Sequence, residues 1–185
     1  MKTITKIALA ANAAVLVSMV YLYHDVKATE AAQEAEAVAI TLEVEHQMAL
    51  TKELNCLATN IYHEARNDGM TGQRAVAWAT LNRVESPSYP NTVCEVVYQA
   101  ELNENDIPLR NKCQFSWFCD GKSDDIEDQA SWNVAQSIAE EVMNAYGKET
   151  DPTNGAIMYH AHYVEPFWVS SYTETARIDS HVFYN

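Results

Sequence analysis

The fold and the chemistry of this chain are decided by the stretch Asn60-Ile61-Tyr62-His63-Glu64-Ala65-Arg66. Apolar side chains recur around it at intervals of three and four residues, which predicts one buried helix face. They are Leu54, Leu57, Ala58, Ile61, Tyr62 and Ala65. Glu64 lies at the edge of that face, where partial desolvation raises the pKa of a carboxyl and keeps it protonated near neutral pH, as a general acid requires. The alternative interpretation is a surface glutamate on a core helix.

Length and charge limit the classes of function. A chain of 185 residues is typical of one domain with short appendages. The formal net charge is −14. This charge argues against nucleic acid as a partner, because Lys and Arg contacts to phosphate supply most of the non-specific affinity.

The N-terminal residues 1–28 have the pattern of an export signal. Lys2 and Lys6 precede an apolar run, and Val26-Lys27-Ala28 offers small residues for cleavage. The run is also nearly long enough to span a bilayer, so a retained membrane anchor is an equal alternative. Either way we expect the rest of the chain outside the cytoplasm, in the periplasm or cell envelope.

Residues 29–53 are rich in Ala and Glu and contain no Gly or Pro. We expect a helical or partly disordered stalk here, because helix propensity is strong and the apolar stripe is weak. The folded domain is predicted to cover residues 54–185.

Within that domain the sequence predicts mainly helices. Thr71 is expected to cap a helix that runs to about Val84, and Thr92-x-x-Glu95 is a capping-box pattern that opens a short helix. The clearest helix is amphipathic over residues 132–146 and is stopped by Gly147. Residues 100–112 are expected to be a surface excursion.

Two strands are predicted near the C-terminus. Residues 156–163 alternate in the period of a strand, with Tyr159 on one face and His160 on the other. Residues 181–184 are expected to form a last short strand.

The four cysteines are Cys56, Cys94, Cys113 and Cys119. None lies in a C-x-x-C pair, and an even number behind an export signal predicts two disulfides. Three pairings exist. We favour Cys56–Cys94 together with Cys113–Cys119, because the second pair closes a short loop.

Several side chains suit the binding of a sugar chain near a general acid. Aromatic faces stack on pyranose rings, and amide side chains bond hydroxyl and N-acetyl groups. The residues of this kind are Gln73, Gln114, Phe115, Trp117, Tyr159 and Trp168. Each also has an ordinary interpretation as a residue of the core.

Metal catalysis and nucleophilic catalysis have weaker signals. His160-x-His162 puts two imidazoles on one strand face, to which His181 and Glu64 could add ligands. The zinc-protease pattern H-E-x-x-H is absent, since no second histidine follows His63-Glu64. No G-x-S-x-G motif is present. We therefore expect neither a metal nor another cofactor, although a membrane-tethered module that only binds glycan is a further alternative.

An ordered set of motifs resembles the cell-wall hydrolase family typified by the spore-cortex-lytic enzyme SleB. The set covers the chain from about Leu54 to the C-terminus. It consists of residues 60–66, Gly72-Gln73-x-Ala75-Val76-Ala77, Leu81-Asn82-Arg83-Val84, Tyr89-Pro90-Asn91-Thr92, Cys113-Gln114-Phe115-Ser116-Trp117, Cys119-Asp120-Gly121, Asp151-Pro152-Thr153-x-Gly155-Ala156, Tyr159-His160-Ala161 and His181-Val182-Phe183-Tyr184.

The resemblance implies an α+β domain, mainly helical with a small antiparallel sheet and distantly lysozyme-like. It implies a lytic transglycosylase that acts on peptidoglycan glycan strands, with Glu64 as catalytic acid/base and with Gln73, Gln114, Phe115, Trp117, Tyr159, His160 and His181 as candidate substrate-binding residues. The chain departs from the family in His63, where better-known members have Gly.

Two further questions stay open at this point. A conventional muramidase would need a second carboxylate, for which Asp179, Asp120 and Asp68 are the candidates. The enzyme could remodel the wall of its own cell or serve a phage lysis system as an endolysin. We expect a monomer whose partners are glycan strands and, if the N-terminal segment is uncleaved, the membrane.

Overall fold

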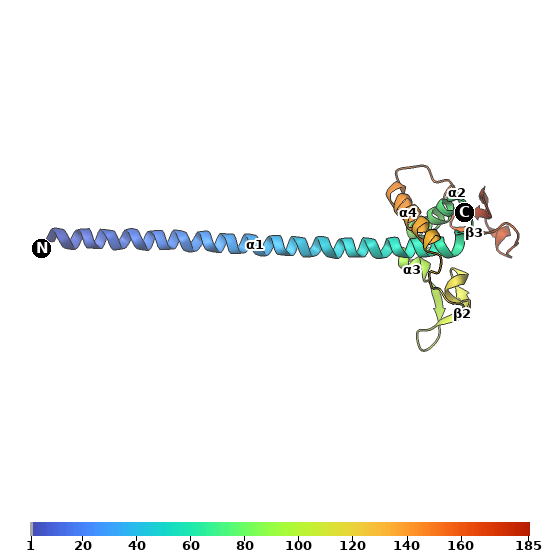
Figure 1. The fold of residues 1–185 in the computed structure, drawn as a ribbon, viewed down its shortest axis with the longest axis horizontal. Helices are drawn as coiled ribbons and strands as arrows, with labels where there is room; N and C mark the ends of the chain where they lie inside the picture. The colour runs from blue at the N-terminus through green and yellow to red at the C-terminus, as the bar shows by residue number, and fades with distance from the viewer. Residues whose placement is uncertain (1) are drawn as a thin grey trace. The chain divides into compact units, whose positions relative to one another are not determined.

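The structure is a computed structural model that describes residues 2–185, with side chains described from residue 15 onward. The predicted signal or anchor therefore begins outside the described residues, at residue 1. The chain divides into two compact units, residues 1–48 and residues 49–185. Figure 1 follows the order of the elements by colour.

Helix α1 runs from Lys2 to Ala65 without a break, so the proposed stalk region is helical along its whole length. Its weak apolar stripe is exposed, including Val38, Ile40 and Leu42. Among the described residues, no helix has an apolar stretch long enough to cross a membrane.

The second unit is mainly helical. After the last turns of α1 come α2 (Met70–Glu85), α3 (Val93–Val97), the 3-10 helix η1 (Ser116–Cys119) and α4 (Gln129–Ala145). The main core is built where α1, α2, α3 and α4 meet, around Leu57, Ile61, Val96 and Val142. The stripe predicted over residues 132–146 supplies the buried face of α4, and that prediction is confirmed.

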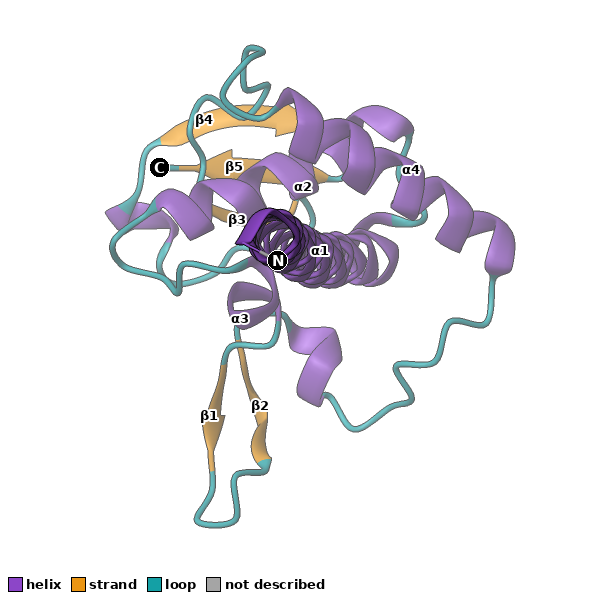
Figure 2. Ribbon diagram, turned by 90° about the vertical axis from the view of Figure 1, so that its left-hand side faces the viewer, coloured by secondary structure: helices purple, strands orange, loops and turns teal. Residues whose placement is uncertain are grey.

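Two small antiparallel sheets complete the unit, and Figure 2 shows them as separate ribbons. β1 (Ala100–Leu102) pairs with β2 (Pro108–Cys113), and the strands β3 (Met158–Ala161), β5 (His181–Tyr184) and β4 (Glu174–Ile178) form a sheet in that order. The second 3-10 helix η2 (Val169–Ser171) precedes β4. The expected α+β class is confirmed.

Residues 100–112 are a largely exposed surface excursion, as expected, and they form the β1–β2 hairpin. Two other local features differ from the sequence prediction. Strand β4 was not predicted, because the alternation of Ala176 and Ile178 with Thr175 and Arg177 is too short to stand out in the sequence. The prediction that Thr71 is the N-cap of α2 is wrong. The N-cap is Gly69, which has no side chain that could bond to the first amides of the helix.

Both expected disulfides are present, Cys56–Cys94 and Cys113–Cys119. The first joins α1 to α3 across a sequence separation of 38 residues. In the chain-entropy model a loop of that length contributes about 4 kcal/mol. Thr92 is the N-cap of α3, as the predicted capping box requires, because its hydroxyl accepts a bond from the Glu95 amide at 3.2 Å. The Glu95 carboxylate accepts from the Thr92 hydroxyl at 2.9 Å, in place of the main-chain amide that a full capping box uses.

Candidate functional site

Glu64 occupies the last turn of α1, one residue before the helix ends at Ala65. Its neighbours Ile61 and Ala65 are buried in the core, which places the Glu64 side chain at the border of that core. The carboxyl is half-buried. Burial raises the pKa of Glu64, because the charged form is poorly solvated there.

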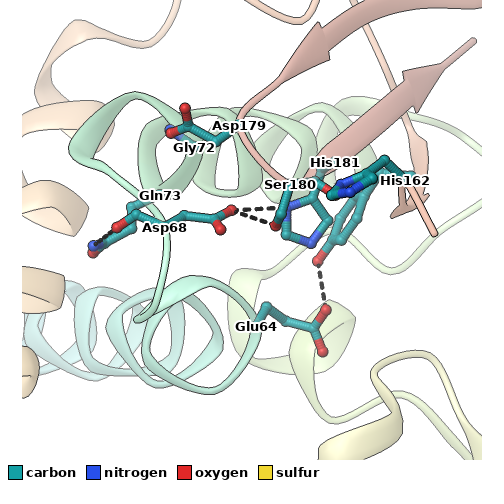
Figure 3. Close-up of polar contacts among 9 residues, drawn as sticks. Glu64, Asp68, Gly72, Gln73, His162, Asp179, Ser180 and His181 are labelled. Atoms are coloured by element: carbon teal, nitrogen blue, oxygen red, sulfur yellow. Dashed lines mark hydrogen bonds and ion pairs between the residues drawn. The ribbon is translucent and has the colours of Figure 1, made fainter.

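Tyr159 of β3 contacts that carboxyl. Its hydroxyl donates to Glu64 Oε2 at 3.3 Å, the contact drawn as a dashed line to Glu64 in Figure 3. Burial and the nearby Glu64 carboxyl raise the pKa of the Tyr159 hydroxyl well above its ordinary value, so this group remains a proton donor. The bond from Tyr159 acts against burial and lowers the pKa of Glu64.

A carboxylate–imidazole pair lies behind Tyr159. His181 Nδ1 is 3.0 Å from Asp68 Oδ2, and the Ser180 hydroxyl donates to the same oxygen at 2.9 Å (Figure 3). The His181 ring meets the Tyr159 ring edge-on, with centroids 5.2 Å apart. Burial lowers the pKa of His181 although Asp68 opposes this, so the imidazole is favoured in its neutral form. The pair thus fixes the ring that carries the hydroxyl facing Glu64.

Arg83 of α2 contacts the same tyrosine from another side. Only 3% of Arg83 is exposed, and its Nε donates to the carbonyl of Ile157 at 2.6 Å. The guanidinium carbon lies 4.9 Å from the ring centroid of Phe115 and 5.4 Å from that of Tyr159. Its positive charge lowers the pKa of Glu64. Sequence reasoning did not assign Arg83 a role, although an arginine inside a largely apolar helix was a usable signal.

Trp117 is fixed by a buried polar chain. Its Nε1 donates to Asn60 Oδ1 at 3.1 Å, and Asn60 Nδ2 donates to the Thr80 hydroxyl at 3.1 Å. The ring stacks on His63, with centroids 4.4 Å apart and planes 18° apart. Burial lowers the pKa of His63. Trp117 and Phe115 are 8% and 3% exposed, so they form packed walls of the site and offer little ring area to a ligand.

The structure thus gathers Glu64, Phe115, Trp117, Tyr159 and His181 from four segments of the chain. Three other candidate residues lie apart from this group: Gln73, Gln114 and His160.

Gln73 is buried, and its Nε2 donates to the main-chain carbonyl of Asp68 at 3.1 Å. In Figure 3 it lies on the side of Asp68 away from His181. Gln114 follows the β1–β2 hairpin and lines a hollow of about 420 Å³ along those strands. Within the described part of the chain, neither side chain forms a hydrogen bond or ion pair with Glu64.

His160 is on the opposite face of the three-stranded sheet. In the β3–β5 register Tyr159 pairs with Phe183 and Ala161 with His181, while His160 pairs with Val182. Adjacent residues of a strand point to opposite faces, so His160 faces away from Tyr159 and His181. Its ring stacks on Tyr184 and lines a separate hollow of about 430 Å³ with His162. His160 and His162 are therefore separated from His181 by the sheet. Within the described part of the chain, no cluster of three or more His, Cys, Asp or Glu residues has a metal-binding arrangement.

The three carboxylates considered as partners for Glu64 each have another contact. Asp68 holds His181, as described above. Asp179 Oδ2 accepts the main-chain N–H of Gly72 at 2.7 Å. Asp120 accepts the main-chain N–H of Lys122 at 2.8 Å. Each of these three carboxylates is thus engaged elsewhere, and Glu64 is the carboxyl in the site that burial keeps in its protonated form.

Comparison with known proteins identifies the family of this domain. Residues 67–184 match the family described as Cell Wall Hydrolase. The chain belongs to the Cell Wall Hydrolase family. The matched range begins three residues after Glu64, so the family match does not itself include this glutamate.

Curated relatives of this Cell Wall Hydrolase domain are spore cortex-lytic enzymes. The protein of Halalkalibacterium halodurans is 28% identical over 134 residues, which cover 72% of this chain and 34% of the relative. The Bacillus subtilis enzyme is 40% identical over 47 residues, 25% of this chain and 15% of the relative. The chain therefore spans about a third or less of these relatives' lengths.

Two solved structures share the fold. The catalytic domain of the Bacillus cereus SleB protein has a TM-score of 0.55 and 25% identity, covering 73% of this chain and 91% of that domain. The catalytic domain of the germination-specific lytic transglycosylase SleB from Bacillus anthracis has a TM-score of 0.53 and 26% identity, covering 72% and 93%. The lysozyme-like expectation for the fold is confirmed through this similarity.

Proposed function

We propose that this chain cleaves peptidoglycan glycan strands as a lytic transglycosylase, at the bond between N-acetylmuramic acid and N-acetylglucosamine, with Glu64 as the general acid and then the general base. The observation that carries the proposal is the half-buried Glu64 carboxyl, whose pKa is raised by burial and which accepts a bond from Tyr159. A glycosidic oxygen needs such a protonated carboxyl beside it in order to leave.

The reaction divides into two proton transfers through one carboxyl. Glu64 first gives its proton to the glycosidic oxygen as the C1–O bond breaks. The resulting carboxylate then removes the proton of the muramyl C6 hydroxyl, whose oxygen attacks C1 and forms a 1,6-anhydro end. Glu64 ends the cycle protonated. No second carboxylate is required, which fits the separate contacts of Asp68, Asp179 and Asp120.

The names of the relatives support the same chemistry, since one structural neighbour is titled a lytic transglycosylase. The substrate lies outside the cytoplasm, so the proposal agrees with an export signal or anchor in residues 1–28. The domain boundary at residue 54, the monomeric state and the membrane attachment remain predictions.

The first test is Glu64→Gln, which keeps the size of the side chain and removes the transferable proton. We expect lysis of purified peptidoglycan to be lost in a turbidity assay. Glu140→Gln, at an exposed position of α4, is the matched control and should lyse like the wild type. A Glu64→Gln variant with a tenth of wild-type activity would exclude Glu64 as the acid.

Mass spectrometry of the released fragments separates the alternatives. Anhydro-muropeptides identify a transglycosylase, whereas reducing ends alone identify a muramidase. Activity abolished by EDTA would point to a metal-dependent hydrolase. Binding of glycan without any released fragment would leave only a non-catalytic module.

A further inference from the structure

Arg83 carries a buried charge without an ion-pair partner. Among the described residues, no carboxylate lies within 4.0 Å of its guanidinium. A guanidinium keeps its proton at all relevant pH values, so the charge is permanent. A buried charge is costly unless its surroundings compensate it, and a residue of this kind therefore needs a specific explanation.

The surroundings of Arg83 hold the guanidinium in one place. Besides Phe115 and Tyr159, the ring of Tyr89 lies 5.5 Å from the guanidinium carbon. These distances are those of cation–π contacts. With the bond from Nε to the Ile157 carbonyl at 2.6 Å, they fix the position of the cation. Nη1 is buried and has no hydrogen-bond partner, so Arg83 still has donor capacity.

The Arg83 guanidinium packs against Tyr159, and the Tyr159 hydroxyl contacts the Glu64 carboxyl. Tyr159 contacts both groups: its ring is 5.4 Å from the guanidinium carbon, and its hydroxyl donates to Glu64 at 3.3 Å. We propose that Arg83 is a positioning residue of this site, a fixed counter-charge that stabilises the Glu64 carboxylate after its first proton transfer and so sets the pH range in which Glu64 acts. This inference rests on the proposed function and extends it.

The remaining groups near Glu64 do not supply that counter-charge. Tyr159 faces it from β3 as a neutral phenol, and His181 of β5, behind Tyr159, is already paired with Asp68. On α1 itself, burial lowers the pKa of His63, which favours the neutral ring. Arg66 is exposed and lies over the ring of Tyr62 at 4.9 Å. Arg83 is therefore the buried cation that acts on Glu64.

The consequence can be measured as a shift along the pH axis. In the proposed reaction the free enzyme needs a protonated Glu64, so activity falls as pH rises through the pKa of Glu64. Burial raises this pKa and Arg83 lowers it. Removal of the charge should raise it further and move the alkaline limit of activity upward, by about one pH unit for a close cation.

The test uses the full-length protein with Arg83→Met and Arg83→Lys. Methionine has similar length and packs well against aromatic rings, while lysine keeps the charge and loses the planar fork. We expect the alkaline limb of the pH–rate profile to move up in Arg83→Met and to stay within about 0.3 unit of wild type in Arg83→Lys. Arg110→Met, on the exposed face of β2, is the matched control and should not move the limb.

A second readout does not depend on lysis. The Glu64 carboxyl is titrated by NMR in protein with ¹³C-labelled glutamate and is identified by the signal missing in Glu64→Gln. Its midpoint should shift upward in Arg83→Met and remain in place in Arg83→Lys. If Glu64→Gln lyses glycan, the proposed function fails, while this titration still decides whether Arg83 controls Glu64.

Several outcomes would overturn the role of Arg83. One is a uniform loss of rate in Arg83→Met with neither the limb nor the Glu64 titration shifted, because this is the effect of a merely structural residue. Another is an equal shift in Arg83→Lys, where the charge is kept. If Arg83→Met does not fold by circular dichroism, Arg83→Gln takes its place: an upward shift of the Glu64 midpoint supports the role, and an unchanged midpoint refutes it.

Discussion

At the scale of single residues, Glu64 is subject to opposing influences. Burial favours its neutral form, while the Tyr159 hydroxyl and the Arg83 charge favour its anion. In the proposed reaction Glu64 serves first as an acid and then as a base, and such a balance suits both steps, because neither protonation state is then prohibitively unstable. Because burial disfavours the Glu64 anion, ionisation of this carboxyl at high pH lowers the free energy of unfolding.

We expect Glu64→Gln to be more heat-stable than the wild type at pH 8. Because the pKa of Glu64 is raised in the folded state, the unfolded chain ionises first as pH rises above about 4.5. The wild type therefore loses stability as pH rises through the folded pKa, and glutamine does not. The gain in melting temperature should be on the order of 2–4 °C, corresponding to about 1 kcal/mol.

Differential scanning calorimetry at pH 4 and pH 8 checks this prediction. The histidines His63 and His181 titrate in both proteins, so their contribution cancels in the difference. A gain of equal size at both pH values, or a loss at pH 8, would contradict a Glu64 carboxyl whose ionisation is disfavoured by folding.

At the scale of the elements, the beginning of α2 depends on a residue far away in the chain. Asp179 has a left-handed backbone (φ +47°) and accepts the Gly72 amide at 2.7 Å. A carboxylate at a helix N-terminus also has favourable electrostatics. Asp68 also lies close to Gly72, and Asp68 contacts His181 of the site. The start of α2 therefore lies between Asp179, in the loop before β5, and the carboxylate that positions His181.

Gly72→Ala should therefore destabilise the protein by about 1–3 kcal/mol. An added Cβ would lie 2.8 Å from Asp179 Oδ2 and 2.9 Å from Asp68 Oδ2. This loss would occur against the usual preference of a helix for alanine over glycine. Urea denaturation followed by circular dichroism measures it.

Thr71→Ala is the matched control for Gly72→Ala. Thr71 is exposed and does not cap the helix, so its replacement should change stability by no more than about 0.5 kcal/mol. A loss of about 1 kcal/mol at Thr71, with none at Gly72, would instead indicate that Thr71 is the N-cap.

At the scale of the whole molecule, all contacts of the site lie within residues 49–185. This unit contains both disulfides, the complete helical core and the three-stranded sheet. The segment before it is a helix with exposed side chains in its described part. Catalysis and attachment should therefore be separable.

A protein that begins at Ala49 should fold and lyse purified peptidoglycan at the rate of the full-length protein, because it retains every contact described for Glu64. Circular dichroism and the turbidity assay check this, after oxidative refolding to form both disulfides. If the shortened protein does not fold, or folds but lyses peptidoglycan more than about threefold more slowly, residues 1–48 contribute to the site itself. A smaller change in rate is expected of a truncation far from the site.

The sequence by itself determined the features that depend on local periodicity and chemistry. The helix around Glu64, the amphipathic helix α4, the last strand and the N-cap at Thr92 all follow from the spacing of side chains along one segment. The exclusion of nucleic acid as a partner was likewise predicted from the net charge of −14 alone.

Only the tertiary structure decided which residues meet. The alternation in β3 predicted that Tyr159 and His160 point to opposite faces, but only the pairing with β5 showed that Tyr159 faces Glu64. Asp179 as the partner of α2 and Arg83 among three rings depend on contacts between distant segments. Such contacts leave no periodic signal in either segment, because burial and register are properties of the assembled core. Glu64 could be singled out in the sequence, whereas its contact with Tyr159 and the place of Arg83 beside that ring could be found only in the fold.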